Sequence, residues 1–303
     1  MNKYIIGIDG GGTKTLGVLY NFEGVELNRV EFGFSNFSMG EAEAKQNIEK
    51  TLHELCKNLE EDRELYIQMG VAGVSKLREQ NLYKAKLEAM FNAQVSLDSD
   101  ALIALYSVKK DQDVNVILVI GGTGSVLMIG EDDHVQIVGG FGHLLGDEGS
   151  AYHLVTSALK KIIEDKESNQ PDTDLSLQIL KEIKAPDYQA IKDFVYNENK
   201  KTIAGLSRFI ANRALNQDPD AIELFIQEGQ FLAKQTLNAY HKIKNKQDVI
   251  IALRGGFLLS APYVKETLIK ELGKHIKDYQ IDVHQVEPVI GAYYLGFLKL
   301  SKR

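Results

Sequence analysis

Two glycine-rich turns carry the clearest chemical signal in this sequence. Each turn follows an apolar run that is typical of a β-strand, at residues 5–8 and at residues 116–120. Glycine lets the backbone approach a bound group without a Cβ in the way, and the N–H groups of such a turn can cradle an anion. We therefore expect the two turns to contact the phosphates of one nucleotide. Their residues are Gly10, Gly11, Gly12, Thr13 and Lys14 in the first turn, and Gly122, Thr123 and Gly124 in the second.

The first turn does not match the better-known phosphate motifs. A P-loop needs a glycine directly before its lysine, but Thr13 precedes Lys14. A dinucleotide-binding fingerprint needs a glycine where Thr15 stands and then a helix, whereas residues 16–20 are apolar and predict a strand. The turn is therefore expected to close a β-hairpin. A plain hairpin turn remains the alternative, but two glycines suffice for one, so the third glycine and the neighbouring Asp9 favour binding.

The chain repeats one pattern of elements. Residues 4–32 and residues 114–140 each predict a strand, a glycine turn, a second strand, a short turn and a third strand. Helix and strand patterns alternate after each trio. The spacing is too long for a solenoid, whose repeats have periods of about 20–50 residues. The repetition therefore predicts two duplicated α/β lobes with a cleft between them.

The second lobe is predicted to contain a large helical insertion. Ser150 is expected to cap a helix, and Asp218 with Pro219 to begin another, because these residue types favour the N-cap and first-turn positions. Amphipathic helical patterns lie near residues 150–163, 175–183, 188–196, 203–215 and 221–244.

The remaining patterns complete the two lobes. The expected elements are helices near residues 40–59, 77–91 and 101–109, strands at 65–71, 94–97, 249–253 and 283–286, a helix that Pro262 opens, and a terminal helix from Pro288. Gly255 and Gly256 follow the strand at 249–253.

Composition and charge restrict the class of protein. The chain has 303 residues, of which 44% are hydrophobic and 25% are charged, as in a globular protein of two domains. Its net charge is −7 and no dense Lys/Arg block occurs, so we expect no nucleic-acid or membrane partner. Cys56 is the only cysteine, which excludes an internal disulfide and a Cys-ligated zinc or iron–sulfur site within one chain. Without a signal peptide or a bilayer-length apolar stretch, the expected location is the cytoplasm.

These motifs carry a resemblance to a known family. The residues at 9–15 resemble the first phosphate loop of the actin-like ATPase superfamily, those at 121–125 its second phosphate loop, and Gly255 with Gly256 its adenosine-binding turn. The segment at 139–152, with its Gly-Asp-Glu-Gly-Ser core, resembles the N-acetylglucosamine kinase branch of the BadF/BadG/BcrA/BcrD ATPase family. The resemblance implies two ribonuclease H-like lobes, formed by residues 1–112 with 288–303 and by residues 113–287. It also implies ATP and Mg²⁺, and we expect a homodimer.

The same resemblance implies roles for single residues. Asp100 is implied to be the general base that takes a proton from the sugar 6-hydroxyl, and Asp9 to hold Mg²⁺ through water. Thr123 is implied to meet the phosphoryl group that the enzyme transfers. The positions implied to hydrogen-bond the sugar are Asn36, Ala72, Gly73 and Asp147.

Structural alternatives exist for several of these residues. Asp100 could be the N-cap of the helix that starts near residue 101. Asp147 and Glu148 could be acids in the first turn of a helix, which interact favourably with its dipole, and for Glu148 we favour that interpretation. Lys14 could contact a phosphate or be a solvated hairpin lysine. Arg254, an unusual residue before the adenosine turn, could stack on adenine or lie on the surface.

We expect an ATP-dependent kinase that phosphorylates the 6-hydroxyl of an amino sugar. N-acetylglucosamine ranks first, although Val126 stands where animal relatives tend to carry a polar residue; N-acetylmuramic acid and glucosamine are the alternatives. A dehydratase-activating ATPase would need cluster cysteines that Cys56 alone cannot supply. A non-catalytic sensor is opposed by the presence of Asp9, Asp100 and both turns. Sugar binding is expected to favour closure of the lobes, which would exclude water.

Overall fold

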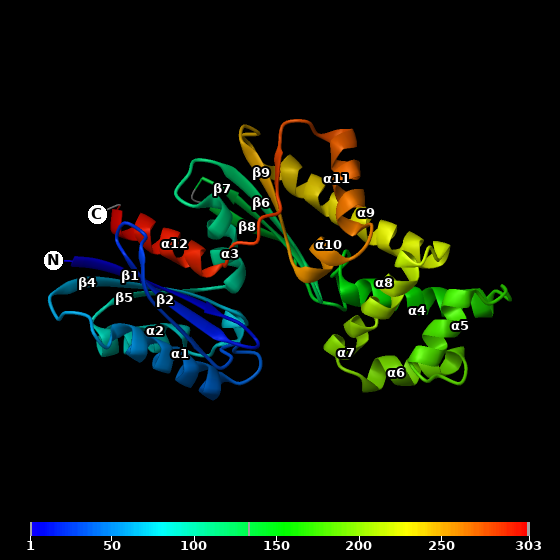
Figure 1. The fold of residues 1–303 in the computed structure, drawn as a ribbon, viewed down its shortest axis with the longest axis horizontal. Coiled ribbons are helices and arrows are strands. Elements are labelled where there is room, and N and C mark those ends of the chain that lie inside the picture. The colour runs from blue at the N-terminus through cyan, green and yellow to red at the C-terminus, as the bar shows by residue number, and fades with distance from the viewer. Residues whose placement is uncertain (1, 133, 302–303) are drawn as a thin grey trace. The chain divides into compact units, whose positions relative to one another are not determined.

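The protein divides into two compact units. A computed structural model describes residues 2–132 and 134–301 (Figure 1). One unit comprises Met1–Asp113 with His284–Arg303, and the other comprises Val114–Val283. Residues 1, 133, 302 and 303, which belong to the expected domain ranges, lie outside the described residues.

The first unit is built on a five-stranded mixed sheet in the order β3-β2-β1-β4-β5. Strands β1, β2 and β3 form an antiparallel meander, and β4 and β5 extend it in parallel with β1. The predicted hairpin is therefore confirmed. The strands are β1 (Asn2–Gly10), β2 (Thr15–Asn21), β3 (Glu26–Phe32), β4 (Arg63–Val71) and β5 (Gln94–Asp98).

Helices cover both faces of this sheet. The helical segments are α1 (Glu41–Cys56), η1 (Val74–Lys76), α2 (Gln80–Phe91), α3 (Asp100–Lys109) and α12 (Val289–Ser301). Successive side chains of a strand point to opposite faces. Accordingly, Ile6 and Ile8 of β1 pack in the core that includes α1 and α2, whereas Ile5 packs with α12 on the other face. In Figure 1, α1 and α2 lie below the sheet and α12 and α3 above it.

The second unit repeats the topology of the first. Its sheet has the order β10-β9-β6-β7-β8, with an antiparallel meander of β6, β7 and β8 and with β9 and β10 parallel to β6. The predicted duplication is therefore confirmed. The strands are β6 (Asn115–Gly121), β7 (Ser125–Glu131), β8 (His134–Gly139), β9 (Val249–Arg254) and β10 (Gln280–Asp282).

The strand expected at residues 283–286 was wrong. Strand β10 ends at Asp282, which pairs with Ala252 of β9. Strand β9 itself ends at Arg254 and the chain then turns into a short helix. Strand β9 therefore continues for two residues beyond this pair, too few to match the whole expected strand, and Val283 and Val286 are exposed.

The predicted helical insertion is confirmed, with two local differences. Ser150 and Asp218 are N-caps, as expected. The helix expected at residues 203–215 is two helices that meet at Leu206, and the short helix after Gly255 was not predicted. The helical segments are α4 (Ala151–Glu167), α5 (Asp174–Glu182), η2 (Tyr188–Ala190), α6 (Ile191–Asn197), α7 (Lys200–Gly205), α8 (Ser207–Leu215), α9 (Pro219–Lys242), α10 (Gly256–Ser260) and α11 (Val264–His275).

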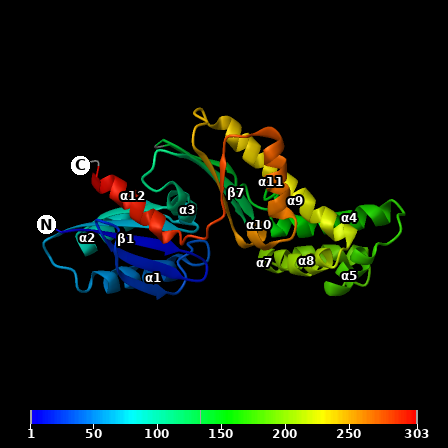
Figure 2. The ribbon, with the colours of Figure 1, turned by 45° about the horizontal axis from the view of Figure 1, so that its top comes forward.

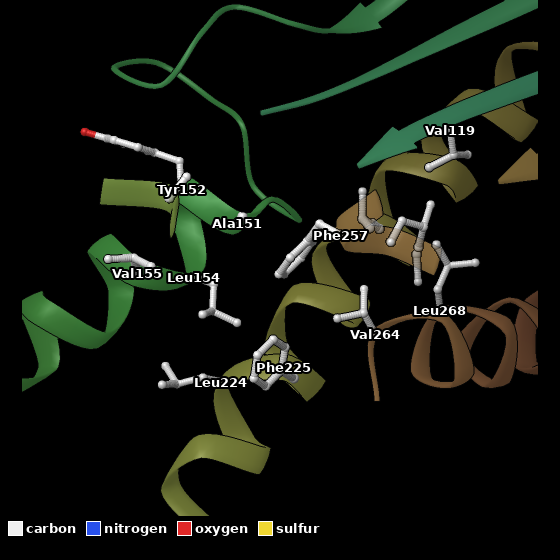
Figure 3. Packing of buried hydrophobic residues seen from close by; sticks show 14 of the residues in the cluster. Val119, Ala151, Tyr152, Leu154, Val155, Leu224, Phe225, Phe257, Val264 and Leu268 are labelled. Atoms are coloured by element: carbon white, nitrogen blue, oxygen red, sulfur yellow. The ribbon is translucent and has the colours of Figure 1, made fainter. Parts of the chain in front are cut away.

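One apolar core joins the insertion to the sheet of the second unit. Helices α4 to α8 gather at one end of this unit, and α9 leads from them toward the sheet (Figures 1 and 2). Phe225 of α9 stacks on Phe257 of α10 with ring centroids 6.0 Å apart, beside Leu154 of α4 and Val264 of α11 (Figure 3). This packing fixes the start of α4 relative to the strands. Within the described part of the chain, no helix is long and apolar enough to cross a membrane.

Candidate active site

The first glycine turn is closed by its own backbone. The Gly11 N–H donates to the Lys14 carbonyl oxygen over 2.9 Å. The Lys14 ammonium forms an ion pair with Glu31 of β3, with 2.7 Å between Nζ and Oε2, and both side chains are about half exposed. Solvent-exposed pairs of this kind contribute little to stability. Lys14 is therefore a solvated hairpin lysine in this structure, and its ammonium is free to exchange Glu31 for another anion.

Backbone hydrogen bonds bring three loops together where β1 ends. The Ala72 N–H donates to the Gly10 carbonyl over 2.8 Å, and the Phe37 N–H donates to the Ala72 carbonyl over 3.1 Å. The Ser35 N–H donates to the Gly11 carbonyl over 3.0 Å. The first turn, the segment around residue 36 and the loop after β4 are thus held side by side.

The residues expected to bind sugar in this unit line one loop junction. The side-chain oxygen of Asn36 accepts the Ser38 N–H over 2.8 Å. Among the described residues, the side-chain amide nitrogen of Asn36 has no hydrogen-bond acceptor. Gly73 has φ 70, and a Cβ there would come within 2.7 Å of that side-chain oxygen. Glycine is therefore needed at residue 73, and the amide of Asn36 is available as a donor.

Asp100 is not the N-cap of α3, so the structural alternative for this residue was wrong. Ser99 takes that position: its backbone is extended and its Oγ accepts the Leu102 N–H over 3.2 Å. Asp100 is the first helical residue and its carboxylate accepts only the N–H of Ala101, at 3.0 Å, among the described residues. The residue as a whole is exposed, although its carboxylate loses part of its hydration. Because Ser99 does the capping, the Asp100 carboxylate is free for other chemistry.

The Asp100 carboxylate influences the protonation of Asp9. Loss of hydration and the negative charge of Asp100 raise the pKa of Asp9 to about 6, although Lys14 opposes the shift. Loss of hydration also raises the pKa of Asp100, and the Ala101 N–H opposes it. A cation between or beside two such carboxylates would favour their charged forms. No group of three or more potential ligands for a metal ion is found in residues 2–132 and 134–301.

The second glycine turn is tied to the start of α4. The Ala151 N–H donates to the Gly122 carbonyl over 3.0 Å, and the Tyr152 N–H donates to the Thr123 carbonyl over 3.3 Å. Thr123 is exposed. In the described chain the N–H groups of Thr123 and Gly124 have no assigned acceptor, so they are available to an anion.

Asp147 is buried and already paired. Its φ is 68 and its exposed fraction is 5%. One carboxylate oxygen accepts the Ser125 N–H over 3.2 Å, and the other accepts the Lys200 ammonium over 2.7 Å. Helix α4 begins only at Ala151, so the interpretation of Asp147 and Glu148 as first-turn acids of this helix was wrong.

Gly124 makes room for this ion pair. A Cβ at Gly124 would come within 2.7 Å of the Asp147 Oδ2 and 2.9 Å of the Lys200 Nζ, whereas a Cβ at Gly122 would meet nothing within 4 Å. Lys200 was not predicted as a site residue. It stands 53 residues from Asp147, directly after the N-cap Asn199 of α7, and no local pattern distinguishes it from the other surface lysines.

A second buried pair supports the same loop and was also missed from the sequence. The Glu228 carboxylate of α9 is 1% exposed; it accepts the Gly149 N–H over 2.7 Å and lies 2.8 Å from His153 Nδ1. Gly149 has φ 85. Loss of hydration raises the pKa of Glu228, and the His153 contact opposes this shift. The pair positions the turn between Asp147 and α4.

The turn after β9 lies against the second glycine turn. Gly255 has φ 96, and a Cβ there would come within 3.0 Å of the Gly121 backbone nitrogen. Gly256 is the first residue of α10. Arg254 does not lie on the surface: its side chain is 12% exposed, and its guanidinium donates to the Asp282 carboxylate over 2.6 Å and thereby ties β9 to β10. Its expected stacking on adenine stays a prediction. The structure thus brings the adenosine-turn residues and the second phosphate-loop residues together in one unit.

Sequence comparisons identify kinases as relatives. The chain is 26% identical over 309 residues to an N-acetylmuramic acid/N-acetylglucosamine kinase from Clostridium acetobutylicum, covering 97% of this chain and 98% of the relative. It is 29% identical over 211 residues to an N-acetyl-D-glucosamine kinase from Dictyostelium discoideum, covering 65% of this chain and 66% of the relative.

A solved structure and a family profile complete the comparison. A protein from Chromobacterium violaceum, whose proposed activity is that of an N-acetylglucosamine kinase, matches with a TM-score of 0.66 and 23% identity over 96% of this chain and 98% of its own. This likeness confirms the two-lobed α/β fold. The profile of the BadF/BadG/BcrA/BcrD ATPase family matches residues 6–296, and the chain belongs to that family.

Proposed function

We propose that this protein is an ATP-dependent kinase that phosphorylates the 6-hydroxyl of an amino sugar. Membership of an ATPase family and the kinase relatives support this proposal. The observation that carries it is the state of Asp100. Its carboxylate is relieved of capping by Ser99, is exposed, has a raised pKa and lies in the unit of the first phosphate turn.

Asp100 acts as the general base in this proposal. A carboxylate with a raised pKa accepts a proton more readily, and general-base catalysis contributes about 10²–10⁴ in rate. As the sugar oxygen bonds to the γ-phosphorus, its proton passes to Asp100, the bond from that phosphorus to the β,γ-bridging oxygen breaks, and ADP leaves. The free N–H groups of Thr123 and Gly124 are suited to hold the negatively charged phosphates.

The residues of the first unit fit a Mg²⁺ ion held largely by water. Magnesium is usually bound by one or two carboxylates together with the phosphates of the substrate, and keeps several waters. Asp9 offers a half-buried carboxylate with a pKa of about 6, and Asp100 lies within its electrostatic range. When bound, the ion would neutralise phosphate charge. Asp9 would hold it, and Lys14 could exchange Glu31 for a phosphate oxygen.

We rank N-acetylglucosamine first as the acceptor, with N-acetylmuramic acid and glucosamine behind it. The names of the two relatives support an N-acetylated amino sugar. The available amide of Asn36, beside Gly73, is suited to a sugar hydroxyl or an acetamido oxygen. The expected homodimer and the expected absence of nucleic-acid partners stay predictions.

A coupled ADP-release assay tests the proposed function. Purified protein is mixed with ATP and each sugar in turn, with Mg²⁺ or with excess EDTA, and glucose serves as the control sugar. ADP release that requires both Mg²⁺ and an amino sugar, with a 6-phosphate product identified by mass spectrometry, supports the proposal. Tight sugar or ATP binding without any turnover would instead favour a non-catalytic sensor. Glucose turnover equal to that of every amino sugar would contradict the amino-sugar assignment.

A further inference from the structure

Lys200 places a positive charge beside Asp147, the carboxylate that the family resemblance implies to be a sugar ligand. Its ammonium nitrogen lies 2.7 Å from the Asp147 Oδ2 and 5.9 Å from the centroid of the Tyr152 ring. The Lys200 side chain is 33% exposed, whereas that of Asp147 is 4% exposed. The lysine therefore forms the solvent side of a pair whose acidic partner is buried.

The ammonium has unused donors. A lysine ammonium carries three N–H donors. In residues 2–132 and 134–301, Asp147 is the only hydrogen-bond acceptor that the structure gives to Lys200. The remaining donors are on a partly exposed side chain, so they can reach a bound molecule. Lys200 thus has both a charge and hydrogen bonds to offer.

A sugar that binds Asp147 must come close to Lys200. The Ser125 N–H already occupies one carboxylate oxygen of Asp147 and Lys200 occupies the other. Each carboxylate oxygen has two acceptor sites, so a sugar hydroxyl has to share an oxygen with one of these donors. The Ser125 N–H is buried, and so the oxygen beside the partly exposed Lys200 is the one that solvent-side ligands meet.

The chemistry of Lys200 favours an acceptor sugar that is itself negatively charged. A carboxylate on a substituent of the sugar would be repelled by Asp147 unless a cation compensated it. Lys200 supplies that cation and can donate directly to the substituent, which gives a charge-assisted hydrogen bond. A neutral N-acetylated amino sugar can accept a hydrogen bond from Lys200 but gains no charge–charge attraction.

We propose that Lys200 is a specificity residue that lets the enzyme accept, beside N-acetylglucosamine, amino sugars bearing a carboxylate-containing ether substituent, such as N-acetylmuramic acid. This inference rests on the proposed function, because it assumes that an amino sugar binds at Asp147. It predicts that N-acetylmuramic acid is an acceptor of this enzyme, and that Lys200 determines how well it competes with N-acetylglucosamine.

The test is the ratio of kcat/KM for N-acetylmuramic acid to kcat/KM for N-acetylglucosamine. Lys200→Gln should lower both efficiencies, because Asp147 loses its partner. The ratio should also fall, by about 10- to 100-fold, because only N-acetylmuramic acid loses a hydrogen bond between two charged groups. Lys200→Arg should retain most of the ratio because it keeps the charge. Lys201→Gln removes an adjacent exposed lysine of the same helix, and is the matched control that should keep the ratio.

Three further measurements make the outcome decisive. Calorimetric binding of each sugar reports on affinity apart from turnover, and circular dichroism reports whether Lys200→Gln is folded. Raising the salt concentration should lower the ratio in the wild-type protein, because screening weakens the charge interaction; this measurement decides the case even if the variant does not fold.

The possible failures can be told apart. If the wild-type protein neither binds nor phosphorylates any amino sugar, the proposed function fails and this inference fails with it. If N-acetylglucosamine reacts but N-acetylmuramic acid neither binds nor reacts, only the inference is overturned. An equal loss of both efficiencies in a folded Lys200→Gln, with a ratio that does not respond to salt, would also overturn it, since Lys200 would then only support the loop.

Discussion

Asp100 and Asp147 were both expected to contact the sugar, yet their surroundings differ. Asp100 is exposed, begins α3 and accepts one N–H, from the next residue. Asp147 is buried in a backbone conformation with φ 68 and is bonded to Ser125 and Lys200. The Asp100 carboxylate is therefore free to take up a proton, whereas the Asp147 carboxylate stabilises the loop to which it belongs. Loss of Asp100 should therefore affect chemistry, and loss of Asp147 should affect structure and binding.

The largest effect is expected on turnover at Asp100. Asp100→Asn should lower kcat by about 10²–10⁴ because the neutral amide cannot accept the hydroxyl proton. Sugar and ATP affinities should change little. The coupled assay measures kcat, and calorimetry measures both affinities. A variant with near-normal kcat would show that Asp100 is not the base.

Stability should separate the two aspartates. Asp147→Ala leaves the Ser125 N–H without its acceptor and should lower the free energy of unfolding by about 1–3 kcal/mol. Asp100→Ala removes an exposed carboxylate and should change it by less than about 0.5 kcal/mol. Urea unfolding followed by circular dichroism gives both values, and Asp147→Asn, which retains an acceptor oxygen, is the control for the charge alone. Sugar affinity of Asp147→Ala should fall more than ATP affinity. Equal losses of stability in the two alanine variants would contradict the comparison.

The two glycines of the second turn should differ because only one of them packs against the Asp147 pair. Gly124→Ala would force the Asp147 and Lys200 side chains to move, and should lower stability by about 1–2 kcal/mol. Gly122→Ala meets open space and should be close to neutral for stability. Thermal melting of both variants measures the difference. If the two melt alike, Gly124 is not needed to accommodate the ion pair.

The smallest effect concerns the pH dependence of stability at Asp9. Its pKa of about 6 in the folded protein lies above the ordinary value, so the folded state binds the proton more tightly than the unfolded state does. The Asp9 carboxyl therefore costs stability as pH rises from about 4 through 6, and Asp9→Asn removes that cost. The variant should be more stable than the wild-type protein at pH 7.5, and this difference in stability should shrink as the pH falls to about 4. A constant difference over this range would show that Asp9 is not perturbed.

Much of the fold could be predicted because its signals are local. Alternation of apolar residues predicted the strands, and the apolar residues after Lys14 distinguished a hairpin from a helix. The cap side chains of Ser150 and Asp218 accept N–H groups that are only two or three residues further along the chain. The strand expected at residues 283–286 was wrong because a strand also requires a partner along its length, and β9 continues for only two residues beyond the pairing of Asp282 with Ala252.

The candidate site was predicted less completely. The glycine turns and Asp9 are recognisable because their residue types and spacing are themselves the signal. Glu228 and Lys200 are not, because they are 79 and 53 residues away from the groups they bind. The capping role of Ser99 was missed because serine and aspartate are nearly equivalent at an N-cap, and only the backbone conformation decides between adjacent candidates.

The sequence by itself determined the duplicated α/β architecture, the hairpin at the first turn and the positions of both glycine-rich turns. These features follow from periodicity and from the conformational freedom of glycine, which act over a few residues. Only the tertiary structure decided that Asp100 is a free carboxylate and that Asp147 is a committed one. That difference depends on burial and on partners such as Lys200, which the fold brings close from distant segments of the chain. A residue's hydrogen bonds and its loss of hydration are set by the groups that surround it in the folded protein, and not by its residue type.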